Sequence, residues 1–425
     1  MNIQAVLAYV DTLREELIAL RRDFHKHPEL LFEVDRTAEK VADYLSALGL
    51  QVQRHVGKHF GKGVVGVLTS ARPGPTIVLR ADMDALAIHE ENTAEYRSEN
   101  VGVMHACGHD AHMTMLLGAA KALSQHREMW SGTIKFVFQP AEESALPSPI
   151  DGRMISGGRD MIEAGVLEDA DLCFALHVWP ELPTGVVGIH RKEAMAASSH
   201  FHMTFKGLNG HHSTPHLAVD ALSMAVQFIS DVKFALAAEI DPWETKVFAF
   251  GTLHAGTAIN AIAGESKLSG TYRVFHPKLT GQIHQLLEKR ADAVASTYGG
   301  SYTSQYRLGT PLLNETSAVQ LTMQAGQLAL GDDKIVILDK PSLAGEDFAL
   351  YVQVVPGAFA FIGIANPTAE TVYPLHHPLF NIDEEVLTQG AKLFVQWVQQ
   401  AGEAYADQQA GVPLFKTKPM RYNKS

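Results

Sequence analysis

Short, uninterrupted apolar runs that alternate with amphipathic segments constrain the fold of this chain more than any other feature. Residues 132–138, 172–178 and 358–364 form such runs. Successive side chains of a strand point to opposite faces of its sheet, so a strand that is apolar throughout must be covered on both faces. The alternation therefore predicts an α/β domain in which a mixed sheet has helices on both faces.

Helical spacing of apolar residues marks the segments that would cover this sheet. One helix is expected at the start of the chain, over residues 3–20. A second is expected over residues 36–48, with Asp35 placed to cap its start and Gly49 to close its end. Further helices are expected at 111–125, 315–330 and 383–404, and two earlier strands at 63–69 and 76–80.

The pattern changes between residues 188 and 304. Apolar and polar residues alternate over 200–205, which predicts a strand with one solvated face. The following segments read as helix, strand, strand and helix, at 218–238, 246–253, 267–274 and 279–298. We therefore predict an inserted, ferredoxin-like α+β domain at 188–304, between two parts of the first domain at 1–187 and 305–425. The polar tail from residue 407 is assigned no chemistry.

Charge and composition restrict the partners and the compartment. The chain has 47 acidic and 35 basic residues, a formal net charge of −12, which disfavours nucleic acid and anionic membrane surfaces. Beyond its start, the most apolar stretch is 358–365, far shorter than the roughly 20 residues that cross a bilayer. Two cysteines in 425 residues give no disulfide framework. A soluble cytoplasmic protein is expected, since the start also lacks the pattern of a secretory signal.

Candidate metal ligands are concentrated at residues 104–112. Cys107 and His109 are two residues apart before a predicted helix, so both side chains can face one point. A thiolate and an imidazole together suit zinc, manganese, cobalt or nickel. A buried cysteine beside a capping His-Asp pair explains this segment equally well when it is taken alone.

Carboxylates and imidazoles follow other predicted strands. Glu142 and Glu143 come where an apolar strand ends, so one could bind a metal and the other act as a general base. His177 ends another apolar run, and His376 lies in a later loop. Asp84 follows the strand at 76–79 and could orient ligand imidazoles. Each segment has a structural alternative. The two glutamates could lie in a solvated loop, either histidine could be an ordinary core or loop residue, and Asp82, beside Asp84, could form a salt bridge at the end of its strand.

Together these segments resemble the aminoacylase and carboxypeptidase family of two-metal peptidases, in particular the amidohydrolase branch of hippurate and indole-acetyl-amino-acid hydrolases. The resemblance spans nearly the whole chain, through ordered motifs at 22–29, 80–86, 105–110, 139–143, 207–216, 256–260, 270–273, 345–348 and 375–378. It implies two divalent metal ions and a general base, Glu142. The implied metal ligands are Cys107, which bridges the two ions, His109, Glu143, His177 and His376.

The resemblance also assigns roles to the inserted domain. That domain matches the family's lid, which forms the dimer interface, so a homodimer or a tetramer is expected. His211 falls where a histidine binds the substrate carbonyl or its oxyanion. Asn260 and Arg273 match positions that contact a substrate carboxylate. A turn cap for Asn260 and an acidic partner for Arg273 remain the structural alternatives.

At three places the sequence departs from the family pattern, and these departures bear on the residue roles that the resemblance implies. The lid motif at 207–213 lacks the usual lysine and contains an additional histidine, His212. The loop after Glu143 is longer and richer in proline than expected. His377 adjoins His376, and His376 is chosen because it matches the family's Leu-His pair.

The sequence thus predicts a metal-dependent hydrolase of N-acyl amino acids, with acetyl, benzoyl or aryl-acetyl groups, or of small peptide-like conjugates. A dipeptidase or carboxypeptidase on the same site is one alternative. A catalytically silent metal-binding protein is another, although it would not need the unligated Glu142. A nucleobase deaminase would need a Pro-Cys-x-x-Cys segment, which is absent. A hydrolase with Cys107 as nucleophile would keep its activity in excess chelator.

Overall fold

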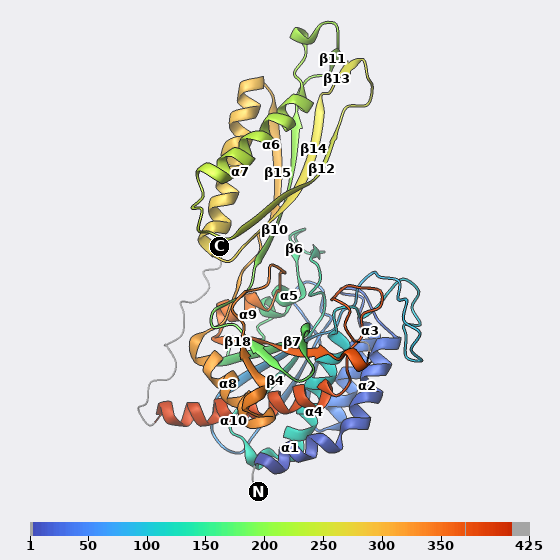
Figure 1. Ribbon diagram of the computed structural model, residues 1–425, viewed down its shortest axis with the longest axis vertical. Helices are drawn as coiled ribbons and strands as arrows, with labels where there is room; N and C mark the ends of the chain where they lie inside the picture. The colour runs from blue at the N-terminus through green and yellow to red at the C-terminus, as the bar shows by residue number, and fades with distance from the viewer. Residues whose placement is uncertain (1–2, 370, 410–425) are drawn as a thin grey trace. The chain divides into compact units, whose positions relative to one another are not determined.

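The computed structural model of the protein describes residues 3–369 and 371–409 (Figure 1). The chain forms two compact units. Unit 1 contains residues 1–194, 313–340 and 347–425, and unit 2 contains residues 195–312 and 341–346. The chain therefore leaves unit 1 somewhat later than the expected boundary at 187, and it contributes a short second segment to unit 2. Most of the polar tail lies outside the described residues.

Unit 1 is built on a mixed eight-stranded sheet. Its inner strands β4, β3, β7 and β18 run parallel, whereas β1, β2 and β8 join it by antiparallel pairing. This confirms the predicted mixed sheet. In spatial order the strands are β1 (Gln51–Val56), β2 (Gly63–Thr69), β4 (Thr133–Gln139), β3 (Thr76–Asp82), β7 (Leu172–Pro183), β18 (Gly357–Ala365), β8 (Val187–Ile189) and β17 (Ile335–Ile337).

Helices cover both faces of this sheet, as predicted. On one face, Ile77 and Leu79 of β3 share a core with the helices α1, α2, α3, α4, α8 and α10. On the other face, α5 and α9 pack on β4 and β18, and Phe359 meets Phe348 at a ring distance of 5.8 Å (Figure 1). The helices are α1 (Ile3–Thr12), α2 (Arg14–Lys26), α3 (Asp35–Ala47), α4 (His109–Gln125), α5 (Gly157–Glu163), α8 (Thr316–Leu330), α9 (Ala349–Val354) and α10 (Val386–Gln409).

Two expectations about the first helices are wrong. The single helix expected over 3–20 is two helices, α1 and α2. Asp35 does not cap α3, because it is already the first helical residue. The free amides of that helix start are instead bound by Glu29, whose carboxylate accepts from the N–H groups of Arg36 (3.2 Å) and Thr37 (2.8 Å). Gly49 does close the helix, with φ +77°.

Unit 2 is a four-stranded antiparallel sheet with two helices on one face. The chain order is β10 (Ala197–Lys206), α6 (Ala221–Ala238), β12 (Lys246–Ala255), β14 (Glu265–Val274), α7 (Pro277–Tyr298) and β15 (Ser301–Arg307). The spatial order β12-β14-β10-β15 is that of a ferredoxin-like unit. Phe201, Met203 and Phe205 of β10 are buried, whereas His202 is exposed, so the expected polar face is present.

Helix α6 is long and apolar enough to cross a membrane, by length and composition only. This apolar segment, Ala221–Ala238, is longer than the stretch at 358–365. In unit 2, α6 buries Met224, Phe228 and Val232 and packs on β10, β12 and β14. It is a covering helix of this sheet. The remaining short strands are β5 (Leu146–Pro147), β6 (Met154–Ile155), β9 (Glu193–Met195), β11 (Gly210–His211), β13 (Ala261–Ile262) and β16 (Leu312–Leu313).

Candidate active site

The predicted metal-binding residues gather where the strand order of unit 1 changes direction. The strand β3 lies between β4 and β7, and all three run parallel, so their carboxyl ends open at the same edge of the sheet. Such a point is the usual ligand site of an open α/β sheet. Asp84 follows β3, Glu142 and Glu143 follow β4, and His177 lies on β7.

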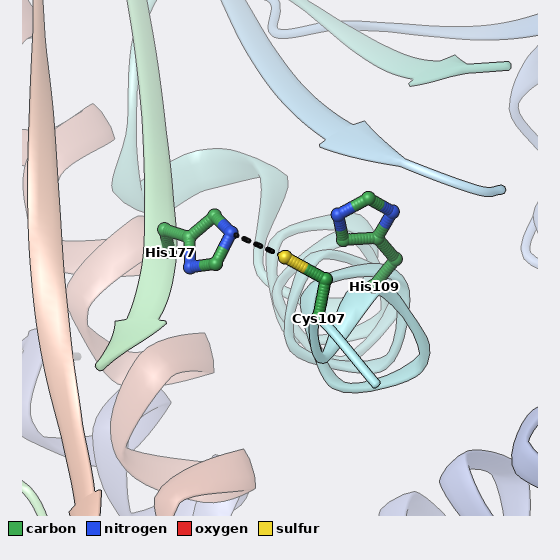
Figure 2. Close-up of side chains that lie close together, drawn as sticks. All are labelled: Cys107, His109 and His177. Atoms are coloured by element: carbon green, nitrogen blue, oxygen red, sulfur yellow. Dashed lines mark hydrogen bonds between the residues drawn. The ribbon is translucent and has the colours of Figure 1, made fainter. Parts of the chain in front are cut away.

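His177 is not at the end of its strand, contrary to the expectation, because β7 continues to Pro183 alongside β18. The pairing of β7 with β3 stops at Ala175, two residues before His177. The side chain of His177 therefore lies past the last pair with β3. Figure 2 shows its ring directed at Cys107, which precedes α4, with His109, the first residue of α4, close by.

The ligand atoms form two groups that share one sulfur. Cys107 Sγ lies 3.4 Å from His177 Nε2 and 3.4 Å from His376 Nε2. Glu143 Oε1 lies 3.4 Å from His376 Nε2 and 3.9 Å from His109 Nε2. One group is thus Cys107, His109 and His177, and the other is Cys107, Glu143 and His376. This arrangement places Cys107 between two potential cation positions.

Hydrogen bonds determine which nitrogen each buried imidazole offers. His109 Nδ1 donates to the carbonyl oxygen of Asp84 (2.7 Å), and His177 Nδ1 donates to the carbonyl oxygen of Val178 (2.7 Å). Both Nε2 atoms are left for the shared site. His109 Nε2 and Glu143 Oε1 are buried and make no hydrogen bond among the described residues. Buried polar atoms without a partner are costly, which favours a bound cation here.

Asp84 orients its neighbours through two different groups. Its main-chain carbonyl holds His109, whereas its carboxylate accepts the backbone N–H groups of Glu142 (2.9 Å) and Glu143 (3.2 Å). From the sequence, the Asp84 side chain is expected to orient a ligand imidazole, and in the structure the main-chain carbonyl of Asp84 makes the hydrogen bond to His109. The side chain orients the segment that carries both glutamates.

Two residues beside the ligands have strained backbone conformations. His376 has φ +65° and Ala141, which precedes Glu142, has φ +47°. The left-handed region is uncommon for residues other than glycine, and such strain often occurs at functional sites. The backbone N–H of His376 donates to Ala106 (2.8 Å), and that of Ala141 donates to Leu31 (3.1 Å). These bonds hold both turns in place.

The electrostatics of the site favour cations. Burial, together with Glu143 and Glu142, raises the pKa of Cys107 well above its ordinary value. Burial would lower the pKa of His109, but Asp82 and Asp84 outweigh it and raise that pKa to about 10. Burial lowers the pKa of His177 well below its ordinary value, so this imidazole is a neutral donor. Sulfur, nitrogen and carboxylate ligand atoms in one cluster fit two divalent ions such as zinc, manganese, cobalt or nickel.

Glu142 is held next to these groups without lying in either group that contains Cys107. Its Oε1 accepts the backbone N–H of Asp347 at 3.3 Å. The Asp347 carboxylate in turn accepts from Arg80 (3.0 Å), Gln139 (2.8 Å) and the N–H of Gly158 (2.7 Å). Sequence reasoning assigned no role to Asp347, although it lies in the quoted motif at 345–348.

The other predicted site residues belong to unit 2. His211 lies on β11, exposed, with Nδ1 2.7 Å from Ser213 Oγ. The pairing of β11 with β13 brings it close to Asn260, whose carbonyl accepts the N–H of His212 (3.2 Å). Arg273 on β14 donates to the carbonyl of Leu343 (2.9 Å), and this contact, rather than an acidic side chain, binds it among the described residues.

The fold and the site define a metal-dependent hydrolase: an α/β sheet whose carboxyl edge presents a shared cysteine sulfur, imidazoles and paired glutamates. The chain belongs to peptidase family M20/M25/M40, whose model matches residues 78–400.

Relatives and solved structures agree with this family. The chain is 36% identical over 316 residues to an N-acyl-L-amino acid amidohydrolase of Geobacillus stearothermophilus, covering 74% of this chain and 82% of that protein. It is 33% identical over 384 residues to thermostable carboxypeptidase 1 of Saccharolobus solfataricus, covering 90% and 94%. The structure matches the Bacillus subtilis YXEP protein, a dinuclear metal-binding peptidase, with a TM-score of 0.78 and 30% identity, covering 92% and 99%.

Proposed function

We propose that this hydrolase cleaves the amide bond of N-acyl amino acids, releasing a carboxylic acid and a free amino acid. The observation that carries the proposal is the pair of ligand groups that share Cys107, with Glu142 adjacent to Glu143. The amidohydrolase relative supports this substrate class. The carboxypeptidase relative makes dipeptide cleavage on the same site the second candidate.

In this proposal each residue of unit 1 has a defined task. Cys107, His109, Glu143, His177 and His376 hold the two metal ions. Two such ions supply a polarised amide carbonyl and a water of lowered pKa. Glu142 removes a proton from the attacking water and delivers it to the leaving amine. The N–H of Asp347 orients the carboxylate of Glu142 for both transfers.

In unit 2, three side chains are proposed to bind the substrate. His211 donates to the oxyanion that forms from the amide carbonyl. Arg273 and Asn260 bind the carboxylate of the amino acid, because a guanidinium and an amide both donate to carboxylate oxygens. Arg273 is held in place by Leu343 through a single N–H group, Nη1.

The loop after Glu143 is proposed to contact the acyl group. It forms a hairpin of β5 and β6, and it closes on itself because the N–H of Gly157 donates to the carbonyl of Ala141 (2.9 Å). The loop therefore begins and ends beside Glu142. Ile150 and Met154 on this hairpin are 62% and 46% exposed. Exposed apolar side chains on a loop anchored beside Glu142 favour benzoyl or aryl-acetyl groups over acetyl.

A homodimer through unit 2, the proposed lid, is supported by two exposed features. The edge strand β12 is paired on one side only, to β14. Helix α6 exposes Leu222, Val226 and Phe234, which share one face of the helix. Light scattering on the wild type and on Phe234→Glu checks this, with a dimer or a tetramer expected for the wild type and a smaller species for the variant. Two free buried cysteines agree with a cytoplasmic location.

The decisive test of the proposed reaction is Glu142→Gln. Amine release is measured from N-acetyl, N-benzoyl and indole-acetyl amino acids and from dipeptides. The variant should bind two metal ions, as the wild type does, and lose about 10²- to 10⁴-fold in kcat, the usual contribution of a general base. Glu95→Gln is the matched control, because Glu95 is an exposed glutamate of unit 1. A Glu142→Gln enzyme with wild-type kcat would refute the assignment.

A further inference from the structure

His112 lies next to the proposed ligands, and both of its ring nitrogens are engaged. Its Nε2 accepts the backbone N–H of Val178 (2.9 Å), so Nε2 must carry the lone pair. The proton is therefore on Nδ1, which donates to Asp82 Oδ1 (2.7 Å). The side chain is buried. A ring nitrogen of His112 lies close to potential ligand atoms of Asp82 and His109. His112 nevertheless has no lone pair left for a metal ion, because both ring nitrogens are already hydrogen-bonded.

The backbone of Val178 connects His112 to the proposed ligand His177. Its N–H donates to His112, and its carbonyl accepts Nδ1–H of His177 (2.7 Å). The two rings also pack edge to face, with centroids 4.5 Å apart. Strand β18 pairs with β7 through Val178 on one edge, and on the other edge His112 binds the Val178 N–H, while the Val178 carbonyl holds the ring that points Nε2 at Cys107. Pairing with β3 cannot do this, because it ends at Ala175.

The ring of His112 is held in turn by buried polar residues on its Nδ1 side. Asp82, which accepts its Nδ1–H, also accepts from Arg80 Nη1 (2.7 Å). Arg80 is bound in addition by Gln139 (3.1 Å) and by Asp347 (3.0 Å). All of these side chains except Asp347 are fully buried. The orientation of His112 is thus determined by a network anchored on β3 and β4.

We propose that His112 is a positioning residue for His177, acting through the backbone of Val178, and not a metal ligand. The proposal rests on the ligand set given under the proposed function. Outer partners of metal-binding imidazoles typically contribute 10- to 100-fold to metal affinity. His112 should contribute on this scale to the ion bound by His177, and little to the other ion.

Two substitutions separate the two contacts of His112. The carboxamide oxygen of His112→Gln reaches the position of Nε2 and can accept the N–H of Val178. The shorter carboxamide of His112→Asn reaches the position of Nδ1 and can only donate to Asp82. His126→Asn is the matched control, because the ring of this histidine, just beyond the other end of α4, hydrogen-bonds only to the carbonyl of Ala122 among the described residues.

The measurement is zinc content by mass spectrometry and zinc affinity by chelator competition, with thermal unfolding of the metal-free proteins. His112→Asn is expected to weaken the binding of one of the two ions 10- to 100-fold, the same ion that His177→Ala is expected to affect, whereas His112→Gln and His126→Asn should stay within about threefold of wild type. Equal weakening by the Asn and Gln variants, or none by Asn, would overturn the proposal. If His112→Asn does not fold, the Gln variant decides by itself: retained affinity supports the role and lost affinity refutes it. A wild type that binds fewer than two ions would instead refute the ligand set.

Discussion

Asp84→Asn tests whether the segment carrying both glutamates is positioned from β3. In the wild type, the two oxygens of the Asp84 carboxylate accept from the N–H groups of Glu142 (2.9 Å) and Glu143 (3.2 Å). A carboxamide has one acceptor oxygen and one NH2 group. One backbone N–H would therefore face another donor instead of an acceptor.

The magnitude follows from this mismatch. A hydrogen bond to a charged group contributes about 1.5–3 kcal/mol, and a buried donor without a partner costs about 1–3 kcal/mol. The Asn variant can avoid part of this cost by moving Glu142 and Glu143 away from their positions. We expect this displacement to raise the activation free energy by about 1.4–2.8 kcal/mol, because Glu142 and Glu143 leave their catalytic positions. That increase corresponds to a 10- to 100-fold loss in kcat/KM.

The assay is kcat/KM for amine release at saturating metal, with metal content measured on the same samples. The matched control is Asp171→Asn. Asp171 also accepts a backbone N–H, that of Thr76 (2.9 Å), but at the opposite end of β3. The control should keep wild-type kcat/KM. An Asp84→Asn enzyme that is as active as the control would show that this carboxylate does not position the glutamates.

Three further predictions concern metal, pH and substrate. Removing metal with chelator should abolish activity, and adding back zinc, manganese, cobalt or nickel should restore it; activity in excess chelator would favour Cys107 as a nucleophile. Burial, with Arg307 beside it, lowers the pKa of His200 to about 4. The unfolded chain then binds more protons between about pH 6.5 and 4, so stability should fall as pH falls through this window, and it should fall less in His200→Gln, as measured by thermal unfolding. Replacing Ile150 and Met154 by Ser should lower kcat/KM for benzoyl substrates by about 10-fold relative to acetyl substrates, with metal content unchanged; an equal effect on both would refute a role in acyl selection.

The fold class could be predicted because apolar runs record burial on both faces of a strand. The same logic placed Asp84, Glu142 and Glu143 at one edge of the sheet, since they follow predicted strands and the carboxyl ends of parallel strands share one edge. The cap of α3 could not be predicted in this way. Glu29 reaches that helix start across a turn, and nothing in the local sequence marks it in preference to Asp35.

The resemblance named His109 and not His112 as a ligand, and tertiary structure supplies a physical reason for that prediction. His109 and His112 are three residues apart on α4, and residue type does not distinguish them. His109 bonds through Nδ1 and leaves Nε2 for the proposed metal ion, whereas His112 uses both nitrogens. Their partners lie on or beside β3 and β7, far away in the sequence.

The sequence by itself determined the α/β class, the two-part organisation and the types of donor atoms, because these depend on local periodicity and on residue chemistry. Tertiary structure decided which lone pairs remain available, which carboxylate orients which segment, and the left-handed conformation of His376. These features depend on hydrogen bonds between distant segments. Strand register and loop packing set those bonds, and neither is encoded in any single stretch of the chain.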